Sequence, residues 1–165
     1  MTMCALAVAF LTLASFNAPA QTNATGASTV GTGKVDLSKT TFGAEPVPKA
    51  ITLTILNDSI ELTSWRVEVV DAKGESSAYS WSGPLDGSPH PVKDPKGQVL
   101  LQESLTRDKQ GALLRRGEES DGSSFDARST LSEDGNTITD VITMKTKDGK
   151  TSTETTVYRR VITGK

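Results

Sequence analysis

The chain has 165 residues, a formal charge of −2 and a single cysteine. This length fits one domain, and one cysteine excludes a framework of disulfides, so stability must come from apolar burial and strand pairing. A charge near zero with no basic cluster argues against a nucleic-acid partner and against binding to an anionic membrane surface.

The first twenty residues contain no Asp, Glu, Lys or Arg. An apolar core over 5–13, followed by a small-x-small site at 18–20, is typical of a secretory signal peptide. We therefore predict a signal peptide over 1–20, a flexible polar leader over 21–30, and a secreted or periplasmic protein without stable membrane insertion after cleavage. A retained anchor or a buried helix is the alternative, but a spanning helix needs about 20 strongly apolar residues, and polar side chains dilute this segment.

Beyond residue 31, short β-branched runs alternate with glycine-containing turns that recur about every dozen residues. No segment of about 10–15 residues keeps a helical apolar period. A long proline-rich connection at 83–97 carries the only histidine and has room for one short strand at 91–92. The predicted strands are 31–37, 50–55, 60–70, 76–82, 98–106, 112–119, 123–131, 137–145 and 151–162.

Turn chemistry fixes the expected pairing in the first half of the chain. The turn at 72–74 sets Trp65 opposite Trp81 and brings Tyr79 onto the same face. The apolar parity of the strand before this turn changes near 63–64, so we expect a β-bulge or bend there.

The last hairpin carries the strongest turn signal, an Asp-Gly pair at 148–149 between threonine-rich runs. As a two-residue type I′ turn, it sets Asp140 opposite Val157 and places Arg159 on the same inward face. A four-residue loop at 133–136 gives the preceding strand the same inward face.

From residue 31 to 161, the order of features resembles a family of small secreted bacterial β-proteins. The signature Gly-x-Trp-x-Leu-Asn-x-x-Lys-Ser-x-Phe is matched by residues 31–42, and a central Asp-Gly followed by Pro-Val is matched at 86–87 and 91–92. The chain is also similar to lipocalin-like calycins, which have an N-terminal Gly-x-Trp strand and a terminal Arg, although Gly33 stands where their Trp would be. The resemblance implies a calycin-like barrel and at most a role in binding a small ligand.

Consecutive tight turns favour antiparallel neighbours. Pattern and resemblance together predict an all-β fold, an antiparallel up-and-down meander of about eight or nine strands in a single domain over 31–165. A sheet of this kind hides its edges by closing on itself, here into a lipocalin-like barrel.

Six side chains are candidates for a ligand site inside this barrel. They combine aromatic and charged groups on the expected inward face: Tyr79, Trp81, Glu103, Arg116, Asp140 and Arg159. Isolated buried charge is unfavourable, so charged residues persist inside only if they are paired, hydrated or used, and an inward Arg could bind a ligand carboxylate. Alternatively, the charged residues lie at the open rim, or a slip of one residue turns them outward, where surface pairs contribute about 0–1 kcal/mol; the tryptophans are then simply core.

The sequence contains no hydrolase nucleophile elbow, zinc-binding histidine pair or phosphate-binding glycine loop, so we expect no enzyme activity, no cofactor and no metal. His90, between two prolines, is a candidate metal ligand or base, with a surface-loop residue as the alternative. The expected partner is a small apolar or carboxylate ligand; the alternative is a structural or protein-interaction barrel. A ligand site needs roughly 300 Å³ of enclosed space, which a filled interior excludes.

Overall fold

The computed structural model of the protein describes residues 28–43 and 46–162. Ten strands lie within these ranges: β1 (Gly31–Val35), β2 (Ala50–Asp58), β3 (Thr63–Val70), β4 (Ser76–Gly83), β5 (His90–Lys93), β6 (Val99–Arg107), β7 (Leu113–Glu118), β8 (Ser124–Leu131), β9 (Thr137–Lys145) and β10 (Thr151–Arg160). The predicted signal peptide over 1–20 lies outside the described residues, as does most of the predicted leader over 21–30. The described part holds no helix that is long and apolar enough to cross a membrane.

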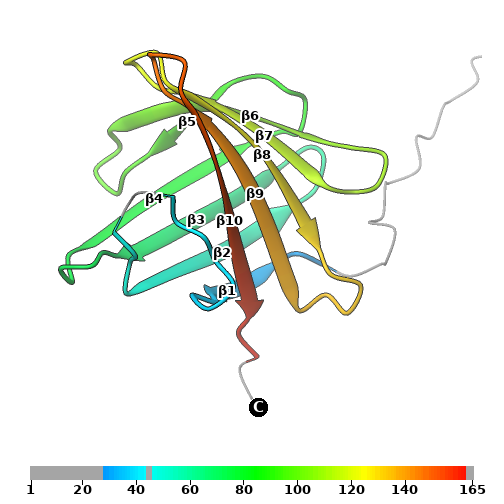
Figure 1. Ribbon diagram of the computed structural model, residues 1–165. Helices are drawn as coiled ribbons and strands as arrows, with labels where there is room; N and C mark the ends of the chain where they lie inside the picture. The colour runs from blue at the N-terminus through cyan, green and yellow to red at the C-terminus, as the bar shows by residue number, and fades with distance from the viewer. Residues whose placement is uncertain (1–27, 44–45, 163–165) are drawn as a thin grey trace, which may run out of the picture.

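The ten strands form one closed antiparallel barrel in which successive strands are neighbours. β1 pairs with both β2 and β10, and this double pairing closes the ring. In Figure 1, β9 and β10 cross β2, β3 and β4 at a steep angle, as expected for the tilted strands of a twisted barrel. The predicted all-β up-and-down barrel is confirmed, with slightly more strands than the predicted eight or nine.

β5 forms within the proline-rich connection, where the sequence left room for one short strand. It pairs with β6 from His90 onward, but its pairing with β4 is a single register pair, Ser80 with Lys93. Pro91 has no N–H to donate to a ladder. The seam between β4 and β5 therefore has fewer register pairs than even the short seam between β1 and β10.

Five connections in the described part of the chain use the same five-residue loop, at 71–75, 94–98, 108–112, 119–123 and 146–150. In each loop, the N–H of the first residue donates to the carbonyl of the fifth, and the N–H of the fourth donates to the carbonyl of the first. The fourth residue is always a glycine with positive φ. This is a type I turn followed by a left-handed residue, a frequent hairpin connection.

The predicted two-residue turn at 148–149 is wrong. A type I′ turn needs positive φ at both central residues, but here Gly149 alone has it, at 81°. The five-residue loop shifts the register by one residue, so Asp140 lies opposite Thr156 and Ile138 lies opposite Tyr158. Thr156 and Tyr158 therefore occupy the register positions on the inward face that we expected for Val157 and Arg159.

The loop at 119–123 also contains an Asp-Gly pair, and it too has five residues instead of a two-residue turn. Its register sets Arg115, not Arg116, opposite the inward-facing Ala127. By contrast, the turns at 72–74 and 133–136 predicted their registers correctly. The bulge expected near 63–64 lies on the facing strand β2, between Ile55 and Asn57.

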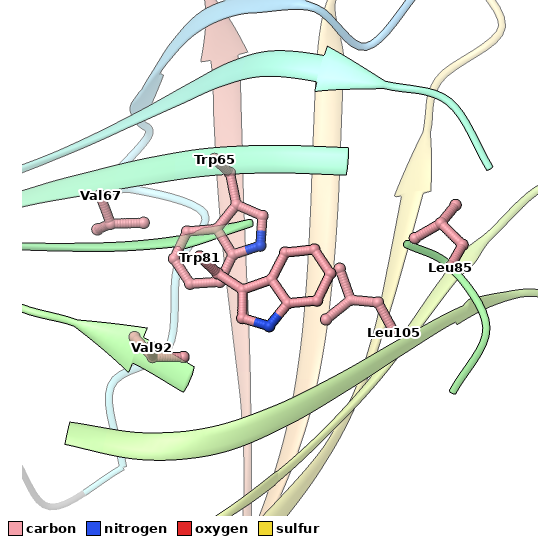
Figure 2. Packing of buried hydrophobic residues seen from close by; sticks show 6 residues of the cluster. All are labelled: Trp65, Val67, Trp81, Leu85, Val92 and Leu105. Atoms are coloured by element: carbon pink, nitrogen blue, oxygen red, sulfur yellow. The ribbon is translucent and has the colours of Figure 1, made fainter. Parts of the chain in front are cut away.

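The apolar core fills only part of the barrel interior. Trp65 and Trp81 come from the paired strands β3 and β4 and are directly opposite in register, as predicted. Figure 2 shows the buried cluster around the two indoles, which consists of Trp65, Val67, Trp81, Leu85, Val92 and Leu105. This cluster joins β3–β6 into one packed wall.

Gly117 provides a test of the inward face of β7. It lies opposite Phe125, and a Cβ added there would stand 2.1 Å from the Phe125 ring. We expect Gly117→Ala to lower the free energy of unfolding by about 1–3 kcal/mol, because the ring must shift within a packed interior.

The matched control is the same substitution in a Phe125→Leu background, where the ring is absent. The two substitutions should couple by at least about 0.5 kcal/mol in a denaturation double-mutant cycle. Additive effects would contradict the packing of Phe125 over Gly117.

Candidate functional site

The barrel encloses a cavity of about 310 Å³. Inward side chains of β2–β4 and β7–β10 form its walls, and residues beside the β2–β3 turn and in the β6–β7 loop line one end, which we call the mouth. These two connections approach each other in Figure 1. Most of the wall is apolar or aromatic: Leu53, Ile55, Trp65, Val67, Tyr79, Leu113, Leu131, Ile138, Ile142 and Tyr158.

A buried ion-pair cluster borders the cavity, with Arg115 of β7 at its centre. The Arg115 Nε–H donates to Glu103 Oε1 at 2.6 Å, and Nη1 donates to Asp140 Oδ2 at 2.9 Å. The other oxygen of Asp140 accepts a hydrogen bond from the Ser129 hydroxyl at 2.7 Å. The side chains of Glu103 and Asp140 are only 1% and 6% exposed. One guanidinium of β7 thus pairs with a carboxylate of β6 and a carboxylate of β9.

The surroundings shift the protonation equilibria of this cluster. Burial opposes the charge on Arg115, but the neighbouring Glu103 and Asp140 outweigh it and raise the pKa of the guanidinium. Burial raises the pKa of Glu103, against the opposing effect of Arg115. Burial also raises the pKa of both Tyr79 and Tyr158, whose phenols are neutral at physiological pH even without this shift.

Aromatic rings surround the guanidinium. The central carbon of Arg115 lies 5.3 Å from the centroid of the Trp65 ring and 5.6 Å from that of Phe125. These distances allow cation–π attraction. Trp65 in turn contacts Tyr79 edge to face, with centroids 6.0 Å apart. The charged cluster is therefore embedded in the aromatic part of the wall.

The mouth is held by further ion pairs. Arg107 pairs with Asp58, and the second oxygen of Asp58 accepts a hydrogen bond from the Thr29 hydroxyl. On β8, Arg128 pairs with Asp108 at 2.9 Å. These contacts connect the segment before β1, the end of β2, the β6–β7 loop and β8 around one opening.

Four of the six predicted site residues lie in the interior. Tyr79 and Asp140 line the cavity, and Glu103 reaches it through its ion pair with Arg115. Trp81 is 2% exposed and belongs to the apolar core; its indole N–H donates to the backbone carbonyl of Glu103 at 3.0 Å. A ligand-binding role for these four residues stays a prediction.

The predicted inward orientation of Arg116 and Arg159 is wrong. The Arg116 side chain is 64% exposed and lies 3.7 Å from Glu118, while that of Arg159 is 54% exposed and pairs with Asp36 at 2.7 Å. Hydrogen bonds from Ser38 and Arg159 lower the pKa of Asp36 to about 2. The one-residue shift at each five-residue loop turned both arginines outward.

Sequence reasoning missed two residues of the site, Arg115 and Tyr158. Each is the immediate neighbour of an outward residue that the predicted register placed inside. A signal for the longer loops was present in the sequence. Gly122 and Gly149 each lie three positions after the first residue of their loop, as Gly74 does in the loop 71–75, whose register was predicted correctly.

His90 is not a surface-loop residue. It begins β5, and its ring contacts Trp81 edge to face with centroids 5.9 Å apart. Its Nε2 is buried without a hydrogen-bond partner within the described part of the chain. Over residues 28–43 and 46–162, no three side chains of His, Cys, Asp or Glu gather as a metal site.

Comparison with known proteins supports the fold alone. A scan against models of protein families finds no match, and a search of curated proteins finds none. Among solved structures, the chain is similar to the fluorescent protein UnaG, as its N57A mutant, with a TM-score of 0.52 and 12% identity over 81% of this chain and 96% of that chain. The protein thus shares with that structure the fold of a closed antiparallel β-barrel.

Replacement of Arg115 tests the buried cluster. Arg115→Met leaves Glu103 and Asp140 as buried carboxylates without their cation, so we expect the free energy of unfolding at pH 7 to fall by about 3–5 kcal/mol. The neighbouring Arg116→Met, on the solvent face, should change it by less than about 0.5 kcal/mol. Urea denaturation measures both, and equal effects would contradict the observed register.

The two tryptophans provide a second matched pair. Trp81→Phe removes a buried hydrogen bond to the Glu103 carbonyl, whereas Trp65→Phe removes an indole N–H that is buried without a partner in the described residues. We expect Trp81→Phe to be more destabilising by about 1 kcal/mol, because the lost bond leaves an acceptor unsatisfied. Thermal denaturation of the two variants is the measurement; a larger loss for Trp65→Phe would refute this assignment.

Proposed function

We propose that this protein binds a small, largely apolar ligand inside its barrel. The observation that carries the proposal is the cavity of about 310 Å³ with mainly apolar and aromatic walls. Ligand sites in proteins are typically concave and apolar, of roughly 300–1,000 Å³, with a few polar groups that orient the ligand. Here the two tyrosines can supply such groups, beside the ion pair of Arg115 and Asp140.

The alternative function is a structural or interaction barrel with a filled interior. Such a barrel should pack its inward side chains at the density of a protein core. The apolar cluster is buried on the side of β3–β6, but the space enclosed by β2–β4 and β7–β10 is as large as a small ligand site requires. The hollow therefore favours ligand binding over the filled barrel.

Secretion is part of the proposal. The uncharged apolar start of the chain and the small-x-small site at 18–20 support export to the periplasm or the medium. The matches at 31–42, 86–87 and 91–92 support a place among small secreted bacterial β-proteins. We expect a binding protein without enzyme activity.

Binding of the neutral fluorescent probe N-phenyl-1-naphthylamine tests the proposal. We expect one probe per chain, with fluorescence enhancement, and a co-purifying small molecule in native mass spectrometry of protein from its own host. Ile142→Phe, which adds volume at a cavity wall, should weaken probe binding at least about tenfold.

The matched control is Val141→Phe on the same strand, since Val141 faces outward and is 41% exposed. It should leave probe affinity unchanged. The proposal fails if the probe does not bind, or if the two variants weaken it equally.

A further inference from the structure

The charges around the cavity are already compensated. Each of the three arginines that line it, within the described residues, is paired with a carboxylate of the protein. Arg107 pairs with Asp58 and Arg128 pairs with Asp108 at the mouth. The inner cation, Arg115, has two carboxylate partners instead of one. The cavity therefore offers a ligand no surplus of positive charge.

The inner cluster itself carries an excess of negative charge. One guanidinium and two carboxylates sum to a charge of −1 when all are ionised. Protonation of Glu103, whose pKa is raised by burial, brings the sum to zero and not above it. A ligand carboxylate would be a third anion at Arg115, desolvated and next to like charges, which is unfavourable.

The carboxylate of the inner cluster that lines the cavity is also fixed in place. One oxygen of Asp140 accepts from Arg115 and the other accepts from Ser129. A ligand anion could reach the guanidinium as a replacement for Asp140 only if both of these hydrogen bonds broke. A ligand ammonium would have to share the Asp140 oxygens with Arg115 and Ser129, because the other carboxylate of the cluster, Glu103, is only 1% exposed.

Neutral hydrogen-bonding groups remain available. Tyr79 and Tyr158 both line the cavity, and each phenol can donate one hydrogen bond and accept another. A phenol is uncharged at neutral pH, and burial raises the pKa of both tyrosines further. A hydroxyl or carbonyl group on a ligand matches this chemistry, and the surrounding apolar wall matches a hydrocarbon body.

We infer that the cavity selects an uncharged, largely apolar ligand with one hydroxyl or carbonyl group, and that it discriminates against a carboxylate. This inference rests on the proposed function and narrows it. It revises the sequence-based expectation, which named a small apolar or carboxylate ligand.

Competition against N-phenyl-1-naphthylamine at pH 7.5 tests the inference with three probes of equal chain length: decan-1-ol, decanoate and decylammonium, each below its micelle concentration. We expect decan-1-ol to displace the fluorescent probe at concentrations at least about tenfold lower than either charged molecule. Comparison in the wild-type protein alone decides the outcome.

A pair of isosteric variants adds an independent measurement. Asp140→Asn removes one negative charge from the cluster, so the ratio between the decanoate and decan-1-ol competition constants should move toward one. Asp126→Asn, at an exposed position of β8 opposite Arg116, should leave this ratio as in the wild type.

The possible failures are distinguishable. If decanoate or decylammonium competes as well as decan-1-ol, or if none of the three displaces a bound fluorescent probe, the inferred ligand class is wrong while binding in the barrel stands. If the fluorescent probe itself does not bind, the proposed function fails with it.

Discussion

The register of each hairpin is the constraint on which the rest of this structure depends. Five loops share one hydrogen-bond pattern, in which a left-handed glycine follows a tight turn. Because side chains alternate between the two faces of a strand, a shift of one residue exchanges the interior with the surface. At β7, the loop thereby decides that Arg115 and not Arg116 enters the barrel.

In the resulting interior, the apolar core, the ion-pair cluster and the cavity border one another. Arg115 lies against Trp65 and pairs with Glu103, whose carbonyl accepts the hydrogen bond of Trp81. Arg115 also pairs with Asp140, which lines the cavity. Buried charges are tolerated here because each has partners in good geometry, and beside them the two tyrosines line the cavity as neutral polar groups.

Much of this architecture could be predicted from the sequence, because alternation and glycine spacing report strands and turns directly. The pairing of Trp65 with Trp81 followed from a loop of correct length. Arg115 and Tyr158 were missed because an Asp-Gly pair suits both a two-residue turn and the end of a five-residue loop, which differ by one residue in register. The Asp-Gly pair alone cannot choose between them, whereas the loop pattern shared with 71–75 does.

Closure of the ring through β1 has a consequence for folding. The Arg160 guanidinium donates to the backbone carbonyl of Val30, 130 positions earlier in the chain. Hairpins between successive strands need only local contacts, but this contact must wait for the final strand, and distant contacts of this kind slow folding. Until then β1 has one free edge, open to strands of other nascent chains. The interval before β10 pairs with β1 is therefore the one in which this molecule is most exposed to aggregation.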